Sequence, residues 1–208
     1  MPQYKLHYFG VYARAEPSRQ ILAYAKADWE DCRYSMEEWP NHKASMPRGQ
    51  VPCLELADGT KLGESVAIAR FLANSHGLYP QDKLKAYHCD RLVDASNAYI
   101  STVYKPVFAQ GDEAKAAAMN EVLDDVLPKF LDYIEPECAK AENFIVGDIS
   151  LADFYIGGLY VNYFKNSMIY APERWAALLE KYPGFKAYGE RFAGVMAEHL
   201  ASRPPAPV

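Results

Sequence analysis

The sequence predicts two domains, an α/β domain over residues 1–79 followed by an all-helical domain over residues 80–208. Patterns typical of strands and helices alternate as far as residue 77, and no strand-like alternation follows. The segment LYPQD at 78–82 contains a proline and is typical of a linker. With 208 residues, half of them hydrophobic, the chain is long enough to give each domain a buried core.

The first part of the α/β domain predicts a strand, a helix and a second strand. Residues 4–9 alternate and are rich in aromatic side chains, as strands are. Segment 15–27 places apolar residues on one helical face, and its proline suits a first helical turn. Segment 31–36 predicts the second strand. The segment WPNHK at 39–43 is a polar, proline-broken loop with room for one short helix.

A hairpin and a second helix complete this domain. Two strand-like runs within residues 51–63 are joined by Asp-Gly at 58–59, the strongest short-range hairpin signal. Glu-Ser at 64–65 begins a helix that His-Gly at 76–77 ends. The order strand, helix, strand, loop, hairpin, helix describes a small α/β unit of the thioredoxin kind. The side chains expected to face inward from the second helix are Ile68, Phe71 and Leu72.

The second domain shows helical spacing throughout. Apolar residues repeat every three or four positions within 92–103, and the clearest amphipathic stripe covers 122–134. Pro128 inside that stripe is expected to kink the helix rather than end it. Ser150 and Asp153 form a capping box in which aspartate, one methylene shorter, replaces the usual glutamate. The segment Tyr-Pro-Gly at 182–184 precedes the last helix.

Composition argues against several classes of function. The formal net charge of −5 argues against a nucleic-acid partner, because binding phosphates needs a basic face. No apolar run approaches the roughly 18 residues that a membrane span needs. The four cysteines form no C-x-x-C pair and the five histidines lack metal spacing, so we expect no metal. The polar N-terminus and the spacing of the cysteines predict a reducing, cytoplasmic setting. The tail at 203–207 is expected to be frayed or extended, without a function.

Tyr8 closes the first strand, just before a helix start. Its phenol is neutral at pH 7 because its ordinary pKa is about 10. A hydrogen bond from it to a thiol sulfur stabilises only the thiolate, which is the nucleophilic form. We therefore hypothesise that the chain activates a bound thiol, with Arg14 adding positive charge. Taken alone, Tyr8 is more often a core aromatic and Arg14 a solvated side chain.

Two further segments suit a bound peptide. A cis bond before Pro52 would turn the backbone of Val51 outward to pair with an extended peptide, although a trans proline is the commoner case. The hydroxyl of Ser65 and the free N–H groups of its helix suit a carboxylate, although a simple cap is the alternative. Trp39 and Lys43 present an indole N–H and a cation from the polar loop.

Together these segments resemble the cytosolic glutathione S-transferases of the tyrosine type, and within them the sigma class. The resemblance extends over essentially the whole chain. The residues that carry it are His7-Tyr8-Phe9, Arg14-Ala15-Glu16, Trp39-Pro40-Asn41, Lys43-Ala44, Gln50-Val51-Pro52, Ser65, Ile68-Ala69-Arg70 and Ser150-Leu151-Ala152-Asp153.

The resemblance implies the glutathione transferase fold and an enzyme that joins the glutathione thiolate to small hydrophobic electrophiles. It implies Tyr8 and Arg14 as catalytic residues and glutathione as co-substrate. Val51 would pair with the cysteinyl backbone. The residues that would hold glutathione are Tyr8, Arg14, Trp39, Lys43, Gln50, Val51, Pro52, Glu64 and Ser65. The residues expected around the electrophile are Phe9, Val11, Tyr12, Tyr104 and Phe108.

The resemblance also implies a homodimer. Arg48 occupies the position where some classes carry an aromatic side chain that plugs into the partner, so we expect a polar interface. The carboxylate that reaches across many dimers falls at Ala98, with Asn97 before it and Asp94 one turn earlier. Glu64 replaces the glutamine that is common in this branch.

Two alternatives use the same scaffold. One is a glutathione-dependent isomerase of the prostaglandin D synthase type, which needs a particular electrophile pocket. The other is a non-catalytic ligand carrier or a crystallin-like structural protein. The joint presence of Tyr8, Arg14, Lys43, Gln50 and Ser65 argues against a loss of catalysis.

Overall fold

The computed structural model describes residues 2–207, apart from the side chain of Val107, and it divides into two compact units. The first unit holds the chain up to Tyr79 together with the residues from Val195 onward, and the second holds Pro80–Gly194. The helical pattern predicts one domain over residues 80–208, whereas the structure groups the last of these residues with the first unit. The reason is a set of contacts between the C-terminal tail and the N-terminal segment.

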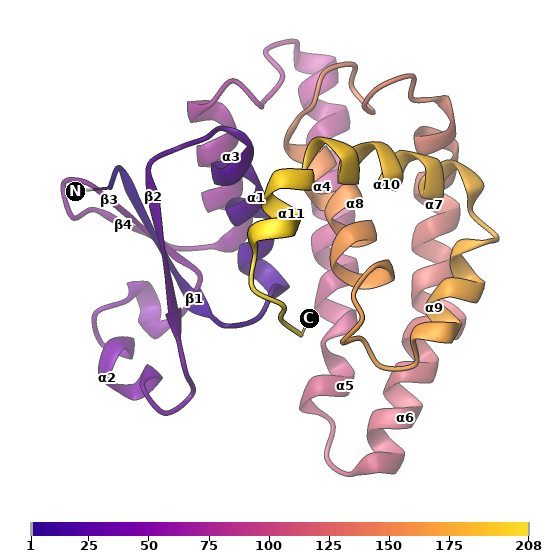
Figure 1. Cartoon of the computed structure of the whole chain (residues 1–208), viewed down its shortest axis with the longest axis horizontal. Coiled ribbons are helices and arrows are strands. Elements are labelled where there is room, and N and C mark those ends of the chain that lie inside the picture. Colours follow the sequence, from indigo (N-terminus) through magenta and orange to yellow (C-terminus); the bar gives the residue numbers. More distant parts are fainter. Residues whose placement is uncertain (1, 208) are drawn as a thin grey trace. The chain divides into compact units, whose positions relative to one another are not determined.

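The first unit is built on a four-stranded mixed sheet with strand order β2-β1-β3-β4 (Figure 1). The central strand β1 (Tyr4–Phe9) runs parallel to β2 (Trp29–Tyr34) and antiparallel to β3 (Cys53–Leu56). A short strand β4 (Lys61–Leu62) pairs antiparallel with β3. This mixed sheet with its helices is the thioredoxin-like arrangement that the element order predicts.

Helices cover both faces of this sheet. Helix α1 (Glu16–Tyr24) packs against α3 (Ser65–Ser75), and the short α2 (Trp39–Lys43) lies on the opposite side (Figure 1). Helix α11 (Ala197–Ser202) contacts α1. Single 3-10 turns occupy Ala13–Ala15 and Pro47–Gly49.

Two details of this unit differ from the sequence pattern. Strand β2 begins at Trp29, two residues before the predicted start, because Trp29 is in register with Tyr4 on β1. On α3, Ile68 and Leu72 are fully buried as predicted, but Phe71 is 38% exposed. The prediction that Phe71 faces inward is therefore wrong. The buried face of α3 is formed by Ile68, Ala69, Leu72 and Ala73. Phe71 lies about 60° around the helix from Ile68 in the opposite direction, at the margin of that face.

The predicted hairpin and helix stop are confirmed. The N–H of Leu56 donates to the Thr60 carbonyl at 2.9 Å, and Gly59 between them has the positive φ of 85° that favours glycine. Helix α3 ends where Gly77 takes φ 70° and the N–H of Leu78 donates back to the Ala73 carbonyl at 2.7 Å.

The second unit is built from helices joined by loops, with one isolated β-bridge between Phe144 and Gly147 in its described residues. Its longest helix, α4 (Lys83–Val103), begins at Asp82, whose carboxylate accepts the N–H groups of Leu84 and Lys85. Helix α8 (Leu151–Leu159) is buried along its whole length and contacts α4. The remaining helices of the unit are α5 (Lys105–Phe108), α6 (Asp112–Glu121), α7 (Leu127–Lys140), α9 (Pro172–Leu179) and α10 (Pro183–Val195).

The predicted amphipathic stripe and capping box are both present. Helical backbone continues through Pro128, after a π-helical turn over Val122–Val126 that directly precedes α7. The side chains of Ser150 and Asp153 form the capping box of α8, and the hydroxyl of the buried Tyr188 donates to the Asp153 carboxylate.

None of the helices in the described part of the chain combines the length and apolarity that crossing a bilayer requires.

Candidate functional site

A cavity of about 630 Å³ opens in the first unit, beside the end of β1 and the start of α3. All the residues predicted to hold the thiol peptide line it except Tyr8 and Lys43. Phe9, predicted for the electrophile, also lines it. The full lining consists of Phe9, Arg14, Trp39, Pro47, Arg48, Gly49, Gln50, Val51, Pro52, Gly63, Glu64 and Ser65.

Tyr8 lies next to last in β1 and is buried, with 7% of its surface exposed. Burial raises the pKa of its phenol, while a hydrogen bond from the backbone of Arg14 and the charges of Arg14 and Arg19 act in the opposite direction. The Arg19 guanidinium lies 5.7 Å from the ring centroid. Because the pKa is raised above an ordinary value near 10, the phenol is neutral and keeps a proton to donate.

Arg14 is half-buried on the 3-10 turn Ala13–Ala15, immediately before α1. Its backbone N–H reaches the Tyr8 oxygen and the residue lines the cavity. One residue therefore contributes both a polar contact to the phenol and a positive charge at the cavity wall.

Helix α2 supplies Trp39 and Lys43. The Trp39 ring meets Phe9 edge to face, with centroids 5.5 Å apart, which orients the indole at the cavity wall. Lys43 is exposed, and its aliphatic stem lies against Gly49, where an added Cβ would stand 3.4 Å from Lys43 Cε. The lysine stem thus packs against the turn that carries Gly49, beside the cavity.

The peptide bond between Val51 and Pro52 is cis, as the resemblance implies. Pro52 is buried directly before β3, while Val51 is half-buried and lines the cavity.

The N-terminus of α3 forms the far wall. Glu64 is its N-cap residue, with φ 69° and ψ 107°, and it makes no side-chain cap. The first-turn N–H groups of a helix without such a cap, together with the helix dipole, suit an anion. Ser65 adds a hydroxyl here, so the predicted carboxylate site is a wall of this cavity.

Arg48 is a charged lining residue that sequence reasoning assigned only to the dimer interface. Its Nη1 donates to Glu64 Oε1 at 2.8 Å, and both side chains are mostly exposed. The pair joins the turn before β3 to the start of α3 across the cavity mouth. No local pattern links positions 48 and 64, because the contact depends on how the hairpin folds back.

The residues predicted around the electrophile come from both units. Phe9 and Val11 are half-buried in the first unit. Tyr104 and Phe108 belong to the second unit, where the Tyr104 hydroxyl lies 3.4 Å from that of Tyr163 and the Phe108 side chain is 76% exposed. Their joint role as one electrophile site stays a prediction.

Tyr12 differs from the others because the C-terminal tail covers it. Its N–H donates to the Pro207 carbonyl at 3.1 Å, its hydroxyl donates to the Pro204 carbonyl at 3.2 Å, and it is 5% exposed. Of the two expected states of the tail, frayed or extended, the structure shows the extended one, docked on Tyr12. A proline-rich tail looks unstructured in the sequence because its partners lie almost 200 positions earlier.

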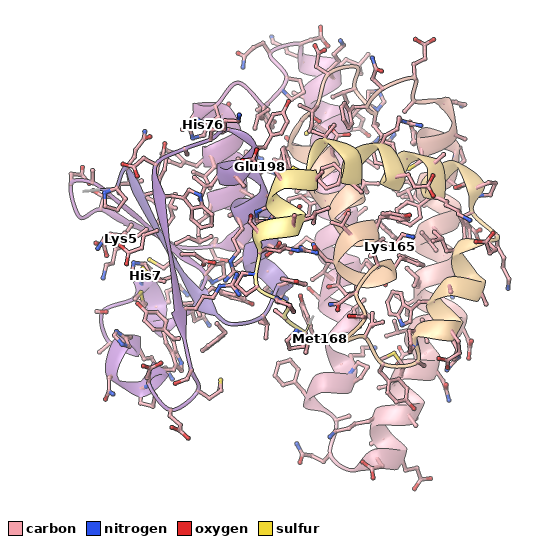
Figure 2. All side chains as sticks on the ribbon, viewed as in Figure 1. Lys5, His7, His76, Lys165, Met168 and Glu198 are labelled. Atoms are coloured by element: carbon pink, nitrogen blue, oxygen red, sulfur yellow. The ribbon has the colours of Figure 1, made fainter. Side chains whose placement is uncertain are left out.

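Two of the histidines, His7 and His76, lie in the first unit. His7 comes from β1 and His76 from the end of α3, apart from each other (Figure 2). Within residues 2–207, no three His, Cys, Asp or Glu side chains gather as a group that could hold a metal ion. All four cysteines are unpaired, and burial raises the pKa of the Cys53 thiol to about 11. Cys53 packs in the sheet, as predicted.

Comparisons with known proteins identify relatives of the whole chain. The family model for the glutathione S-transferase N-terminal domain matches residues 4–74, and that for the C-terminal domain matches residues 97–203. A glutathione S-transferase from Anopheles gambiae is 34% identical over 190 residues, covering 89% of this chain and 88% of the relative. Hematopoietic prostaglandin D synthase from Homo sapiens is 34% identical over 155 residues, covering 74% and 76%. The structure of a Nu-class glutathione S-transferase from Haemonchus contortus is 31% identical, covers 100% of both chains and has a TM-score of 0.83.

Proposed function

The chain belongs to the glutathione S-transferase family, transferases that use glutathione as co-substrate, and from this premise we propose how its own residues hold and activate glutathione. The observation that carries the proposal is the position of Tyr8. Its buried, neutral phenol accepts the Arg14 N–H and lies next to residues of a cavity that suits a peptide.

Each end of glutathione meets matching chemistry in this proposal. Its γ-glutamyl carboxylate accepts hydrogen bonds from the uncapped N-terminus of α3 and from the hydroxyl of Ser65, and its ammonium faces Glu64. The side chain of Gln50 also serves this end. The backbone of Val51 pairs with the cysteinyl residue.

The opposite end carries the glycyl carboxylate. Trp39 offers an indole N–H and Lys43 an ammonium from α2, and both groups suit a carboxylate. The contacts of Trp39 with Phe9 and of the Lys43 stem with Gly49 support this assignment, because they hold the two side chains near the cavity. With both ends held, the thiol is directed toward Tyr8.

The proposed chemistry needs no covalent bond to the enzyme. The thiol proton leaves to water, and the Tyr8 hydroxyl and the charge of Arg14 stabilise the thiolate. The sulfur electron pair forms a bond to an electrophilic carbon. A leaving group then departs with its electron pair, or an acceptor atom takes the charge and a proton from water.

We further propose a sigma-class-like, detoxifying homodimer in the cytoplasm. The motif residues support the class, and the four unpaired cysteines suit a reducing compartment. Asp94 is exposed on α4 and is the candidate for the carboxylate that reaches the partner's glutathione. Sedimentation of the purified chain tests whether it is a dimer. Sedimentation of the Asp94→Asn variant, followed by a glutathione titration, tests whether Asp94 reaches the glutathione of the partner subunit.

The isomerase of the prostaglandin D synthase type is the second candidate. It is favoured by the 34% identity to the human hematopoietic enzyme, which bears that activity in its name. The same thiolate would serve it, so the two candidates differ only in the electrophile pocket. Assaying an aryl halide and a prostaglandin endoperoxide with the same preparation separates them.

The test of the whole proposal is a glutathione titration by calorimetry together with conjugation of an aryl halide. Saturable binding with turnover is expected. Binding without turnover would favour the ligand carrier, and absence of binding would contradict the assignment of the cavity.

A further inference from the structure

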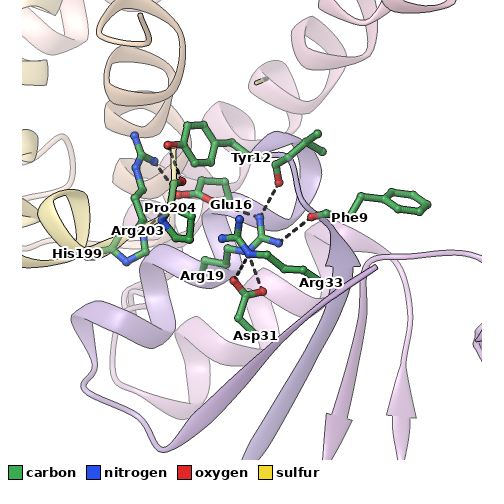
Figure 3. Close-up of polar contacts among 10 residues, drawn as sticks. Phe9, Tyr12, Glu16, Arg19, Asp31, Arg33, His199, Arg203 and Pro204 are labelled. Carbon is green, nitrogen blue, oxygen red and sulfur yellow. Dashed lines mark hydrogen bonds and ion pairs between the residues drawn. The ribbon is translucent and has the colours of Figure 1, made fainter. Parts of the chain in front are cut away.

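A buried cluster of charges joins the C-terminal tail to the segment that follows Tyr8. At its centre Glu16 is fully buried at the start of α1. Its carboxylate accepts a hydrogen bond from Arg203 Nη1 at 2.7 Å and one from Arg19 Nη1 at 3.4 Å, and it lies 3.3 Å from His199 Nε2 (Figure 3). We name Glu16, Arg19, His199 and Arg203 the Glu16 cluster.

Arg19 connects this cluster to the backbone beside Tyr8. Its Nη2 donates to the Phe9 carbonyl at 3.1 Å (Figure 3). Its Nη1 donates to the Val11 carbonyl at 2.7 Å. Its Nε donates to Asp31 at 3.1 Å, so the fully buried guanidinium has acceptors on several sides. The first half of the loop between β1 and α1 is therefore held from inside the protein.

The tail holds the second half of the same loop. The Arg203 guanidinium lies 4.0 Å from the centroid of the Tyr12 ring while it pairs with Glu16. The carbonyls of Pro204 and Pro207 accept the hydroxyl and the N–H of Tyr12. Tyr12 is two residues before Arg14, whose N–H bonds to the Tyr8 phenol.

Proline suits this use of the tail. The carbonyls of residues 204 and 207 are free to accept because the extended backbone makes no helix or sheet bonds there. The fixed φ of proline also lowers the entropy that the tail loses when it docks.

The Glu16 carboxylate is charged in this setting. Burial alone would raise the pKa of Glu16, but the hydrogen bond with His199 and the charges of Arg19 and Arg203 hold it below its usual value. Removing one of its cations leaves a buried charge with less compensation, which is costly.

We propose that Arg203 and the tail at 203–207 are positioning elements for catalysis, which hold the loop of residues 10–14 so that the Arg14 N–H stays on the Tyr8 oxygen. The proposal rests on the proposed function, because it concerns the activation of the same thiol. Arg203 touches no reacting atom in it. Small displacements of a positioned group lower the reaction rate strongly. A loosened loop would weaken the bond from Arg14 to Tyr8, so that the phenol stabilises the thiolate less and the pKa of the bound thiol rises.

Three variants test the proposal. Arg203→Met removes both the ion pair and the donors, whereas Arg203→Lys keeps a charge for Glu16. A chain ending at Arg203 keeps the ion pair but loses the carbonyls of Pro204 and Pro207. Arg191→Met is the matched control, since Arg191 also lies over a tyrosine ring, that of Tyr188, and donates to backbone carbonyls, but in the second unit.

The readout is the pKa of enzyme-bound glutathione, from the ultraviolet absorbance of the thiolate against pH, together with kcat and KM. For Arg203→Met and the shortened chain we expect this pKa to rise by about one unit and kcat near neutral pH to fall up to about tenfold. We expect Arg203→Lys to recover part of that loss. The Arg191→Met control is expected to lower only the melting temperature.

Hydrogen exchange separates the inference from the proposed function. In the protein without glutathione, both tail variants should speed exchange at the Tyr12 and Arg14 amides, and Arg191→Met should not. Unchanged exchange and an unchanged thiol pKa in the tail variants would overturn the inference even if the wild type conjugates glutathione. If the wild type binds no glutathione but the tail variants show the predicted faster exchange, the proposed function is overturned, while the hold of the tail on the loop of residues 10–14 is established.

Discussion

The backbone N–H of Arg14 donates a hydrogen bond to the phenolic oxygen of Tyr8. An N–H bound at that oxygen uses one of its lone pairs and leaves the hydroxyl proton available for an acceptor. Such a polarised phenol is a better donor, because linked hydrogen bonds strengthen each other. The strand end and the following turn therefore form one functional unit rather than two neighbouring motifs.

Replacing Tyr8 with phenylalanine is expected to lower kcat for an aryl halide by about 10²-fold. The pKa of the bound glutathione thiol should rise by about two units, since each unit corresponds to about 1.4 kcal/mol. Stopped-flow absorbance of the thiolate and steady-state assays measure both quantities. Tyr24→Phe is the control, because Tyr24 lies at the end of α1, outside the cavity lining. An unchanged kcat in Tyr8→Phe would refute the catalytic role.

Replacing Glu64 with glutamine is expected to raise KM for glutathione about threefold and to leave kcat unchanged. The substitution removes the charge that would face the γ-glutamyl ammonium. It also breaks the ion pair with Arg48, which is exposed and therefore contributes at most about 1 kcal/mol to stability. Glutathione titrations and urea unfolding check the two effects separately. The exposed Glu113 on α6 provides the control substitution Glu113→Gln. A fall in KM would show that the glutamine common in this branch binds better.

Local signals account for most of what the sequence predicted. The strand at Tyr4–Phe9, the Asp-Gly turn and the capping box at Ser150 each depend on residues within a few positions of one another. The tail on Tyr12 and the bond from Arg48 to Glu64 were missed because each joins distant segments. Such pairs follow from the completed fold, which no local pattern encodes.

The buried His7 on β1 predicts a pH-dependent part of the stability. Its Nδ1 lies 2.7 Å from the Tyr34 hydroxyl and its Nε2 lies 3.4 Å from Glu55. Burial lowers the pKa of the imidazole, Glu55 opposes that effect and Lys61 adds to it. Between this lowered pKa and the unfolded value of about 6.5, the unfolded chain binds more protons. The free energy of unfolding therefore falls as the pH falls through that window.

The variant His7→Gln should flatten this dependence. Urea unfolding of both proteins between about pH 7.5 and about pH 5.5 measures the slope, since this range brackets the unfolded pKa. We expect the wild type to lose more stability than the variant as the pH falls. Parallel curves would mean that His7 binds its proton equally well in the folded and unfolded chains.

The close contact between α10 and the helical turn Tyr160–Phe164, which continues α8, predicts different effects of alanine at two glycines of α10. A Cβ at Gly189 would overlap the buried ring of Tyr160, in the helical turn that continues α8, whereas a Cβ at Gly194 meets nothing within 4 Å. Gly189→Ala should therefore lower the free energy of unfolding by about 1–3 kcal/mol, as overpacking does. Gly194→Ala should be neutral or stabilising by up to about 1 kcal/mol, because alanine favours a helix. Urea unfolding of the two variants compares them directly. Equal destabilisation would show that backbone conformation, rather than the Tyr160 ring, requires glycine in α10.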